Sequence, residues 1–147
     1  EECTCGRRGC FEAYASATAL IRETKRAMAA HPESRMHAAA EENGVVDGRT
    51  AFIAAQRGDA AAQAVVDHYL DDLACGVANI VNIFFPEVIA LSGGVANQGD
   101  ALLVPLREGV RALSYGSRYA VRHTCIELCT LGYRAGVIGA ALLAKQS

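Results

Sequence analysis

Three cysteines near the start of the chain are the residues best suited to chemistry. Cys3, Cys5 and Cys10 fall within eight residues, and two glycines between them allow the segment to bend into a loop. Thiolates this close together suit a tetrahedral zinc ion, and a structural zinc site needs four ligands. The spacing therefore predicts a structural zinc loop with three visible ligands. The alternative is three free thiols, or one disulfide and one free thiol.

The fourth ligand of such a site is not evident from the sequence. A water molecule, Glu1, Glu2 or a side chain of a neighbouring molecule would complete it; otherwise the site stays empty. His31 is a further candidate within the chain. It is a poor one, because the intervening helix would separate it from the loop by roughly 25 Å at about 1.5 Å per residue.

Two further segments contain residue types that are used in binding. Glu12 lies in the first turn of a predicted helix, where the helix dipole stabilises a carboxylate, and this alone explains its presence. Carboxylates also accept strong hydrogen bonds from hydroxyl pairs. Gly93, Gly94 and Asn97 follow a predicted strand and lead into a helix. This arrangement can bring the backbone close to a nucleotide, and it is equally common in structural turns.

The hydrophobic spacing predicts several helices and two short strands, which indicates an α/β fold with a helical bias. Pro105 is expected to break the helix that contains it. The final helix should turn Val137, Leu142 and Leu143 inward. The predicted helices span 11–29, a short part of 33–49, 50–57, 60–85, about 98–113 and a last stretch ending at 144, and the predicted strands span 88–91 and 124–128.

Composition narrows the function classes. The chain has 147 residues, of which 52% are hydrophobic, so it can build one sizeable core. A net charge of −2 and the absence of basic runs argue against binding of nucleic acid by this chain, and no apolar stretch is long enough to span a membrane.

Cys75, Cys125 and Cys129 are predicted to be buried as small hydrophobic residues. Crowded thiols without a signal peptide indicate a reducing, cytoplasmic location.

The segment from Cys3 to Glu12, with the pattern Cys-x-Cys-Gly-x-x-Gly-Cys-x-Glu, resembles the zinc loop of the ROK family of bacterial sugar kinases and sugar-responsive repressors. The resemblance continues through 13–20 and returns in 89–97 and 131–141. It implies the C-terminal half of a longer protein and part of an actin-like (RNase H-like) ATPase domain, with the zinc histidine upstream of Glu1. The implied parts are the zinc loop at 1–12, a helical part at 13–85 and a nucleotide-side part at 86–147.

The resemblance also implies roles for individual residues. Glu12 would bind sugar hydroxyls and be oriented by the zinc loop. Gly93 and Gly94 would line the adenosine site, with help from Asn97. The parent protein would use ATP and Mg²⁺ to phosphorylate the 6-hydroxyl of an aldohexose such as glucose. The family's phosphate loop, base aspartate and Gly-Thr-Gly segment do not occur in this sequence, so no catalytic residue is assigned and the chain alone is expected to be inactive.

Two other functions stay open on the sequence. In a ROK repressor the sugar would act as inducer, and a DNA-binding segment would precede Glu1. A zinc-stabilised interaction domain is the third possibility. In each case half of a larger fold would expose apolar surface, so we expect the chain to form a homo-oligomer.

Overall fold

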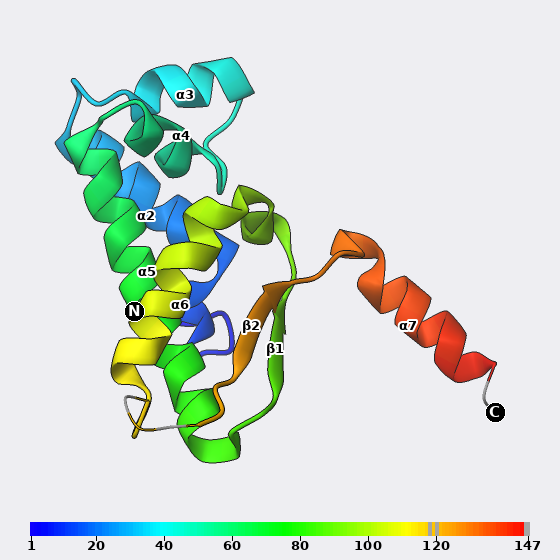
Figure 1. Ribbon diagram of the computed structural model, residues 1–147. Helices are drawn as coiled ribbons and strands as arrows, with labels where there is room; N and C mark the ends of the chain where they lie inside the picture. Colours follow the sequence, from blue (N-terminus) through cyan, green and yellow to red (C-terminus); the bar gives the residue numbers. More distant parts are fainter. Residues whose placement is uncertain (118, 120, 146–147) are drawn as a thin grey trace.

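A single long helix, α5 (Ala60–Phe84), forms the centre of the molecule, and most of the other helices pack around it (Figure 1). The structure is a computed structural model that describes residues 1–117, 119 and 121–145. The described chain is α/β and rich in helix, as the sequence predicts. The remaining helices are α1 (Glu12–Ala15), α2 (Ala17–Ala30), α3 (Met36–Asn43), α4 (Thr50–Gln56), α6 (Asp100–Leu113) and α7 (Ala135–Ala144), with short 3₁₀ turns η1 (Gly94–Gln98) and η2 (Gly132–Arg134).

The core lies between α5 and the helices on either side of it. Asp59 caps the start of α5 by accepting a hydrogen bond from the Ala62 N–H at 2.8 Å, and Pro86 follows its end. The buried face of α5 packs against α2, α4 and α6, while α3 covers α4 at one end. The largest members of this core are Leu20, Met36, Phe52, Tyr69, Leu70, Leu73, Leu102, Leu103, Leu106 and Ile126.

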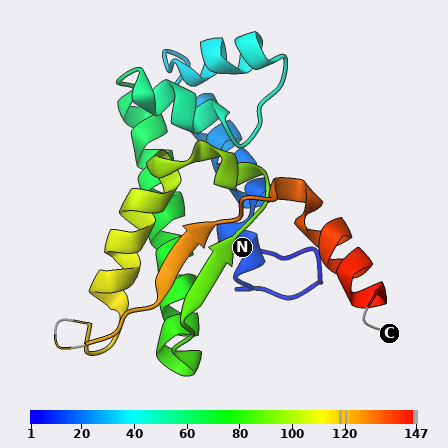
Figure 2. The same ribbon diagram turned by 45° about the vertical axis from the view of Figure 1, so that its right-hand side comes forward.

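The sheet has two parallel strands, β1 (Val88–Leu91) and β2 (Cys125–Leu128), joined by a crossover through α6. Val88 pairs with Cys125 and Leu91 with Leu128. Side chains alternate along each strand, so Ile126 packs into the core while Val88 on the opposite face is exposed. One face of the sheet is therefore covered by helices and the other is bare, as Figure 2 shows.

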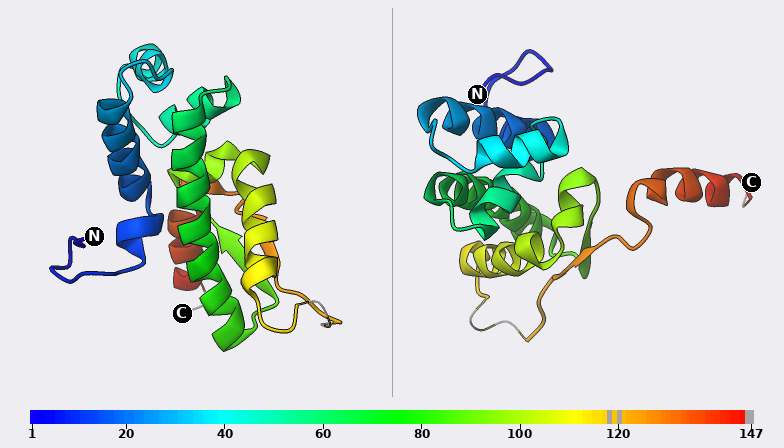
Figure 3. Two further views of the ribbon diagram at one scale, coloured as in Figure 1. Left: turned by 90° about the vertical axis from the view of Figure 1, so that its left-hand side faces the viewer. Right: turned by 90° about the horizontal axis from the view of Figure 1, so that it is seen from above.

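The final helix, α7, differs from its prediction. It extends away from the rest of the molecule (Figure 1 and the right-hand view of Figure 3), and its apolar side chains do not face inward. Val137, Leu142 and Leu143 are 74%, 56% and 70% exposed. The reason is that the described body of the chain offers no surface against which this helix packs.

Three other predictions are wrong. The helix expected over 11–29 is split at Ser16, whose backbone is extended and whose side chain caps α2 by accepting the Ala19 N–H at 3.1 Å. Pro105 lies inside α6, in its second turn, without ending the helix. The buried leucines on either side of it (Leu102, Leu103 and Leu106) hold the helix against α5. Cys75 and Cys125 are exposed.

Close contact between α5 and α6 depends on Gly109. A Cβ atom added at Gly109 would lie 2.9 Å from the Cβ of Ala74, which is buried. We expect Gly109→Ala to lower the free energy of unfolding by about 1–2 kcal/mol, because the overpacking penalty of about 1–3 kcal/mol exceeds the gain in helix propensity of about 1 kcal/mol. Urea denaturation measures this change.

A matched control is Gly139→Ala in α7, where an added Cβ meets nothing within 4 Å. This variant should be neutral or more stable. Adding Ala74→Gly to the Gly109 variant should recover part of the loss. Equal stability of the Gly109 and Gly139 variants would contradict the predicted close contact.

Candidate functional site

The cysteine loop is shaped by its own backbone. The Cys3 N–H donates to the Arg7 carbonyl at 2.8 Å, and the Gly6 N–H donates to the Cys3 carbonyl at 2.9 Å. Gly6 and Gly9 have φ angles of 82° and 78°, which glycine adopts without strain. These two glycines close the loop so that its three thiols point to one place.

The three sulfur atoms lie together, as the spacing predicts. The thiols of Cys3, Cys5 and Cys10 are within 4.8 Å of one another, and the Cys5 and Cys10 sulfurs are 3.6 Å apart. Tetrahedral zinc with Zn–S bonds of about 2.3 Å requires sulfur separations of about 3.8 Å. A disulfide requires an S–S distance of about 2.05 Å. The cluster therefore consists of free thiols whose geometry fits one metal ion.

The hydrogen bonds among the loop thiols shift two of their pKa values in opposite directions. A backbone hydrogen bond from Cys5, together with the Cys5 side chain, lowers the pKa of the Cys3 thiol. Hydrogen bonds with the Cys5 and Cys3 side chains raise the pKa of Cys10 to about 11. The three thiols therefore do not all ionise at neutral pH by themselves, and binding of a metal ion must release protons.

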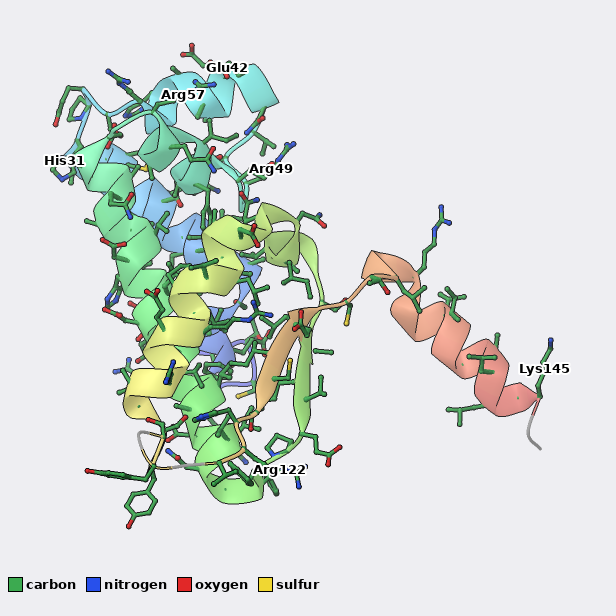
Figure 4. All side chains as sticks on the ribbon, in the orientation of Figure 1. His31, Glu42, Arg49, Arg57, Arg122 and Lys145 are labelled. Carbon is green, nitrogen blue, oxygen red and sulfur yellow. The ribbon has the colours of Figure 1, made fainter. Side chains whose placement is uncertain are left out.

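The carboxylates considered as fourth ligands both contact arginines. The Glu1 carboxylate accepts from Arg26 at 2.6 Å, and the Glu2 carboxylate accepts from Arg8 at 2.5 Å. His31 lies at the far end of α2 beside Glu33 (Figure 4). Within the described residues, none of these candidates joins the thiol cluster.

Glu12 is the first residue of α1, and its side chain is exposed. The short helix is held from two sides. Arg22 of α2 donates to the Ala13 carbonyl at 2.8 Å, and the Tyr69 hydroxyl of α5 donates to the Ala15 carbonyl at 3.1 Å. Burial raises the pKa of Tyr69 to about 12, so this donor stays protonated at neutral pH. The backbone below Glu12 is therefore fixed while its carboxylate is accessible.

Phe11 anchors the segment between the thiol cluster and Glu12. Its ring lies directly on Gly76 of α5, where an added Cβ would be 2.0 Å from the ring. We expect Gly76→Ala to force the ring off α5 and to move Cys10 and Glu12 with it. Phe11 is 45% exposed, so its displacement costs little buried apolar surface, and the free energy of unfolding should change by less than about 1 kcal/mol.

NMR amide shifts of Cys10 and Glu12 measure this displacement. The control is Phe11→Ala, which removes the ring. If the Gly76 substitution acts through Phe11, adding it to the Phe11 variant should cause no further shift at these two amides. Unchanged amides in the single Gly76→Ala variant would refute the anchoring role.

The glycine turn lies at the carboxyl end of β1. Gly93 has a φ of 109°, and added Cβ atoms at Gly93 and Gly94 would meet nothing within 4 Å, so the backbone is open to a ligand. Both glycines and Asn97 are exposed. Val95 between them is buried and fixes the turn to the core. The structure thus places these residues on an accessible, anchored turn, on a different element from Glu12.

A cavity elsewhere in the molecule contains none of the predicted site residues. It has a volume of about 660 Å³ and lies beside the C-terminal end of α6. Its lining comes from segments between Val81 and Glu127 that are distant in sequence. No local motif marks it, which is why the sequence did not reveal it.

Comparison with known proteins shows where this chain belongs. The model of the ROK family matches residues 1–147, the whole chain. The chain belongs to the ROK family. A glucokinase of Halalkalibacterium halodurans is 38% identical over 144 residues, which cover 98% of this chain and 43% of the relative. A xylose repressor of Caldicellulosiruptor bescii is 29% identical over 137 residues, which cover 93% of this chain and 34% of the relative.

The solved structures agree with the fold of this ROK chain. A ROK family glucokinase from Streptomyces griseus, in complex with glucose and AMPPNP, superposes with a TM-score of 0.84 at 31% identity. That superposition covers 97% of this chain and 46% of the glucokinase. The helix-rich α/β architecture is thus confirmed, and the chain spans less than half the length of the glucokinases it matches. Within the residues described, no helix combines the length and apolarity needed to cross a membrane.

Proposed function

We propose that this chain is part of an ATP-dependent hexose kinase of the glucokinase type. The parent protein would transfer the γ-phosphoryl group of ATP to the 6-hydroxyl of an aldohexose. The observation that carries this proposal is the TM-score of 0.84 with a ROK glucokinase in complex with glucose and AMPPNP. The identity of 38% with a second glucokinase supports the same activity.

The chain would contribute parts of an actin-like ATPase domain. In this proposal 1–12 is a zinc loop, 13–85 is a helical part and 86–147 is a nucleotide-side part. Zinc would be the structural metal, held by the thiols of Cys3, Cys5 and Cys10, whose separations suit it. When bound, zinc would stiffen the loop that leads into Glu12.

Glu12 is proposed as the sugar ligand. Its exposed carboxylate stands on a helix turn whose backbone is held by α2 and α5. A carboxylate on a backbone held in this way can accept hydrogen bonds from two sugar hydroxyls, and such charge-assisted bonds are stronger than neutral ones.

Gly93, Gly94 and Asn97 are proposed to line the nucleotide site. The two glycines leave the backbone at the end of β1 uncovered, and the flat face of an adenosine can approach such a surface. Helix and turn amides at the carboxyl end of a strand are a common place for nucleotides in α/β folds. ATP would bring Mg²⁺, which binds through phosphate oxygens.

The decisive experiment uses the whole protein that carries this chain. With ATP, Mg²⁺ and glucose, it should form ADP and a sugar phosphate in a coupled assay. Glu12→Gln should lower kcat/KM for the sugar by about 10–100-fold, the range expected for one lost charge-assisted contact. The 147-residue chain by itself should be inactive, since it lacks the phosphate loop and the base aspartate. Turnover by the isolated chain would overturn that assignment of parts.

A sugar-responsive repressor is the second candidate, favoured by the 29% identity with a xylose repressor. It predicts no phosphorylation by the whole protein and release from DNA when sugar binds. The two outcomes separate the candidates directly.

A kinase that uses ATP and keeps its thiols reduced is expected in the cytoplasm.

We also propose that the chain forms a homo-oligomer. The exposed apolar side chains of α7, with Val137 and Leu143 more than two-thirds exposed, offer a surface that water solvates poorly. Light scattering should give a mass of at least twice that of one chain. A monomer across micromolar to millimolar concentrations would refute this proposal.

A further inference from the structure

The cavity beside α6 is separate from the sites proposed above. It lies between the end of α5, the last turns of α6 and the start of β2. This is the amino-terminal edge of the sheet, whereas the glycine turn follows the carboxyl end of β1. Its volume of about 660 Å³ is within the range of sites for small organic molecules.

The floor of the cavity is apolar and rigid. Val81, Val110 and Ile126 contribute to its lining, and each is no more than 5% exposed. The Asn82 side chain links α5 to the end of α6, since its oxygen accepts the Tyr115 N–H at 2.8 Å. The floor is therefore held by core packing and by this hydrogen bond.

The rim of the cavity is positively charged at one point. Arg107 is paired with Glu127 at 2.8 Å, and Arg122 with Glu87 at 2.7 Å. Arg111 also lines the cavity, and its guanidinium has no hydrogen bond or ion pair with the described residues. A guanidinium that has no partner among the described residues, next to an apolar floor, favours an anionic group on a ligand.

A strained aromatic residue forms part of the wall. Phe85 has φ 43° and ψ 54°, and among the described residues it is the one non-glycine residue with a positive φ. This left-handed conformation is unfavourable for a bulky side chain by about 1–2 kcal/mol. The ring is nevertheless 58% exposed and lines the cavity. Phe85 is the residue that ends α5, where a left-handed conformation is common, although that position usually holds glycine.

We propose that this cavity binds a small organic anion with a flat apolar body. The flat body packs against Phe85 and the apolar floor, and a carboxylate or phosphate group pairs with Arg111. The inference does not depend on the proposed kinase activity, because no residue proposed for sugar, nucleotide or zinc lines the cavity.

The test is an NMR titration of the isotope-labelled chain with three probes of one shape. The probes are naphthalene-2-carboxylate, 2-naphthyl phosphate and the neutral naphthalene-2-carboxamide. At least one anion should shift the amides of Arg111, Ser114 and Ile126, and it should bind about tenfold or more tightly than the carboxamide. The anion that binds more tightly shows which anionic group the site prefers. Equal binding of the carboxamide, or shifts confined to α7, would overturn the proposal.

Two variants and a control separate binding from folding. Arg111→Gln should weaken binding of the preferred anion by about tenfold and leave the carboxamide unaffected. Phe85→Asn should weaken all three probes by about threefold to tenfold. Asparagine tolerates the left-handed conformation, so this variant should be at least as stable as the unmodified chain. Arg49 lies at the other end of the molecule from Arg122, a residue of the cavity lining (Figure 4), so Arg49→Gln should change no affinity. Identical affinities in the Arg111, Phe85 and Arg49 variants would refute the site.

Discussion

Replacing Cys5 with serine is expected to lower the affinity of the chain for zinc by more than about 100-fold. Replacing a residue that only orients a metal ligand lowers the affinity for the metal by about 10–100-fold, and Cys5 would be a ligand itself. Its sulfur is 3.6 Å from that of Cys10, and it lies in the same cluster as Cys3. Elemental analysis after gel filtration should give about one zinc per unmodified chain and almost none for the variant.

The matched control for this prediction is Cys75→Ser. Cys75 is also an exposed free thiol, but it lies on α5 outside the cluster. Its replacement should leave the zinc content unchanged. A chelator should lower the Tm of the unmodified chain and of the Cys75 variant, because a metal that binds the folded state stabilises it. Full zinc content in the Cys5 variant would show that the thiol cluster is not the metal site.

Replacing Asp59 with alanine is expected to lower the free energy of unfolding by about 2–3 kcal/mol. One carboxylate oxygen caps α5 through the Ala62 N–H, and the other accepts from the Ser34 hydroxyl at 2.8 Å and the Arg35 N–H at 2.5 Å. Loss of a helix cap lowers the free energy of unfolding by about 1 kcal/mol. Ser34 is only 6% exposed, and removing the acceptor of its hydroxyl adds about 1–2 kcal/mol.

The effect of this substitution should depend on pH. Burial by itself would raise the pKa of Asp59, but hydrogen bonds from Ala62, Arg35 and Ser34 outweigh burial and lower the pKa below its ordinary value. A lowered pKa in the folded state means that the stabilisation is present above the pKa of the unfolded state. It is lost as the pH falls through the pKa of the folded state. The difference between the Asp59 variant and the unmodified chain should therefore shrink in acid.

Urea denaturation at neutral and acidic pH measures both effects. The control is Asp67→Ala on the exposed face of the same helix, where the carboxylate accepts from the Gln63 side chain at 2.8 Å. That substitution should change stability by less than about 0.5 kcal/mol. If the Asp59 variant is no less stable than the Asp67 variant at neutral pH, the carboxylate does not join α5 to the start of α3 as described.

Local patterns were sufficient for most elements and for the thiol cluster. The three cysteines are close in space because they are within eight residues and two glycines bend the loop. The two strands and the long helix were predicted because side-chain periodicity and capping residues are local properties. The roles of Glu12, Gly93, Gly94 and Asn97 rest on family resemblance and stay predictions.

What the tertiary structure decided depends on partners far apart in the chain. The helix over 11–29 divides at Ser16, and the short first part is held by Tyr69, 54 residues from the carbonyl of Ala15 that it binds. The cavity brings together Phe85, Arg111 and Ile126 from three elements. A short stretch of sequence cannot reveal such contacts, because residues far apart in the chain meet only when α5, α6 and β2 pack together. The sequence by itself determined most of the elements and the cluster of three thiols, and only packing decided which side chains from distant parts of the chain meet.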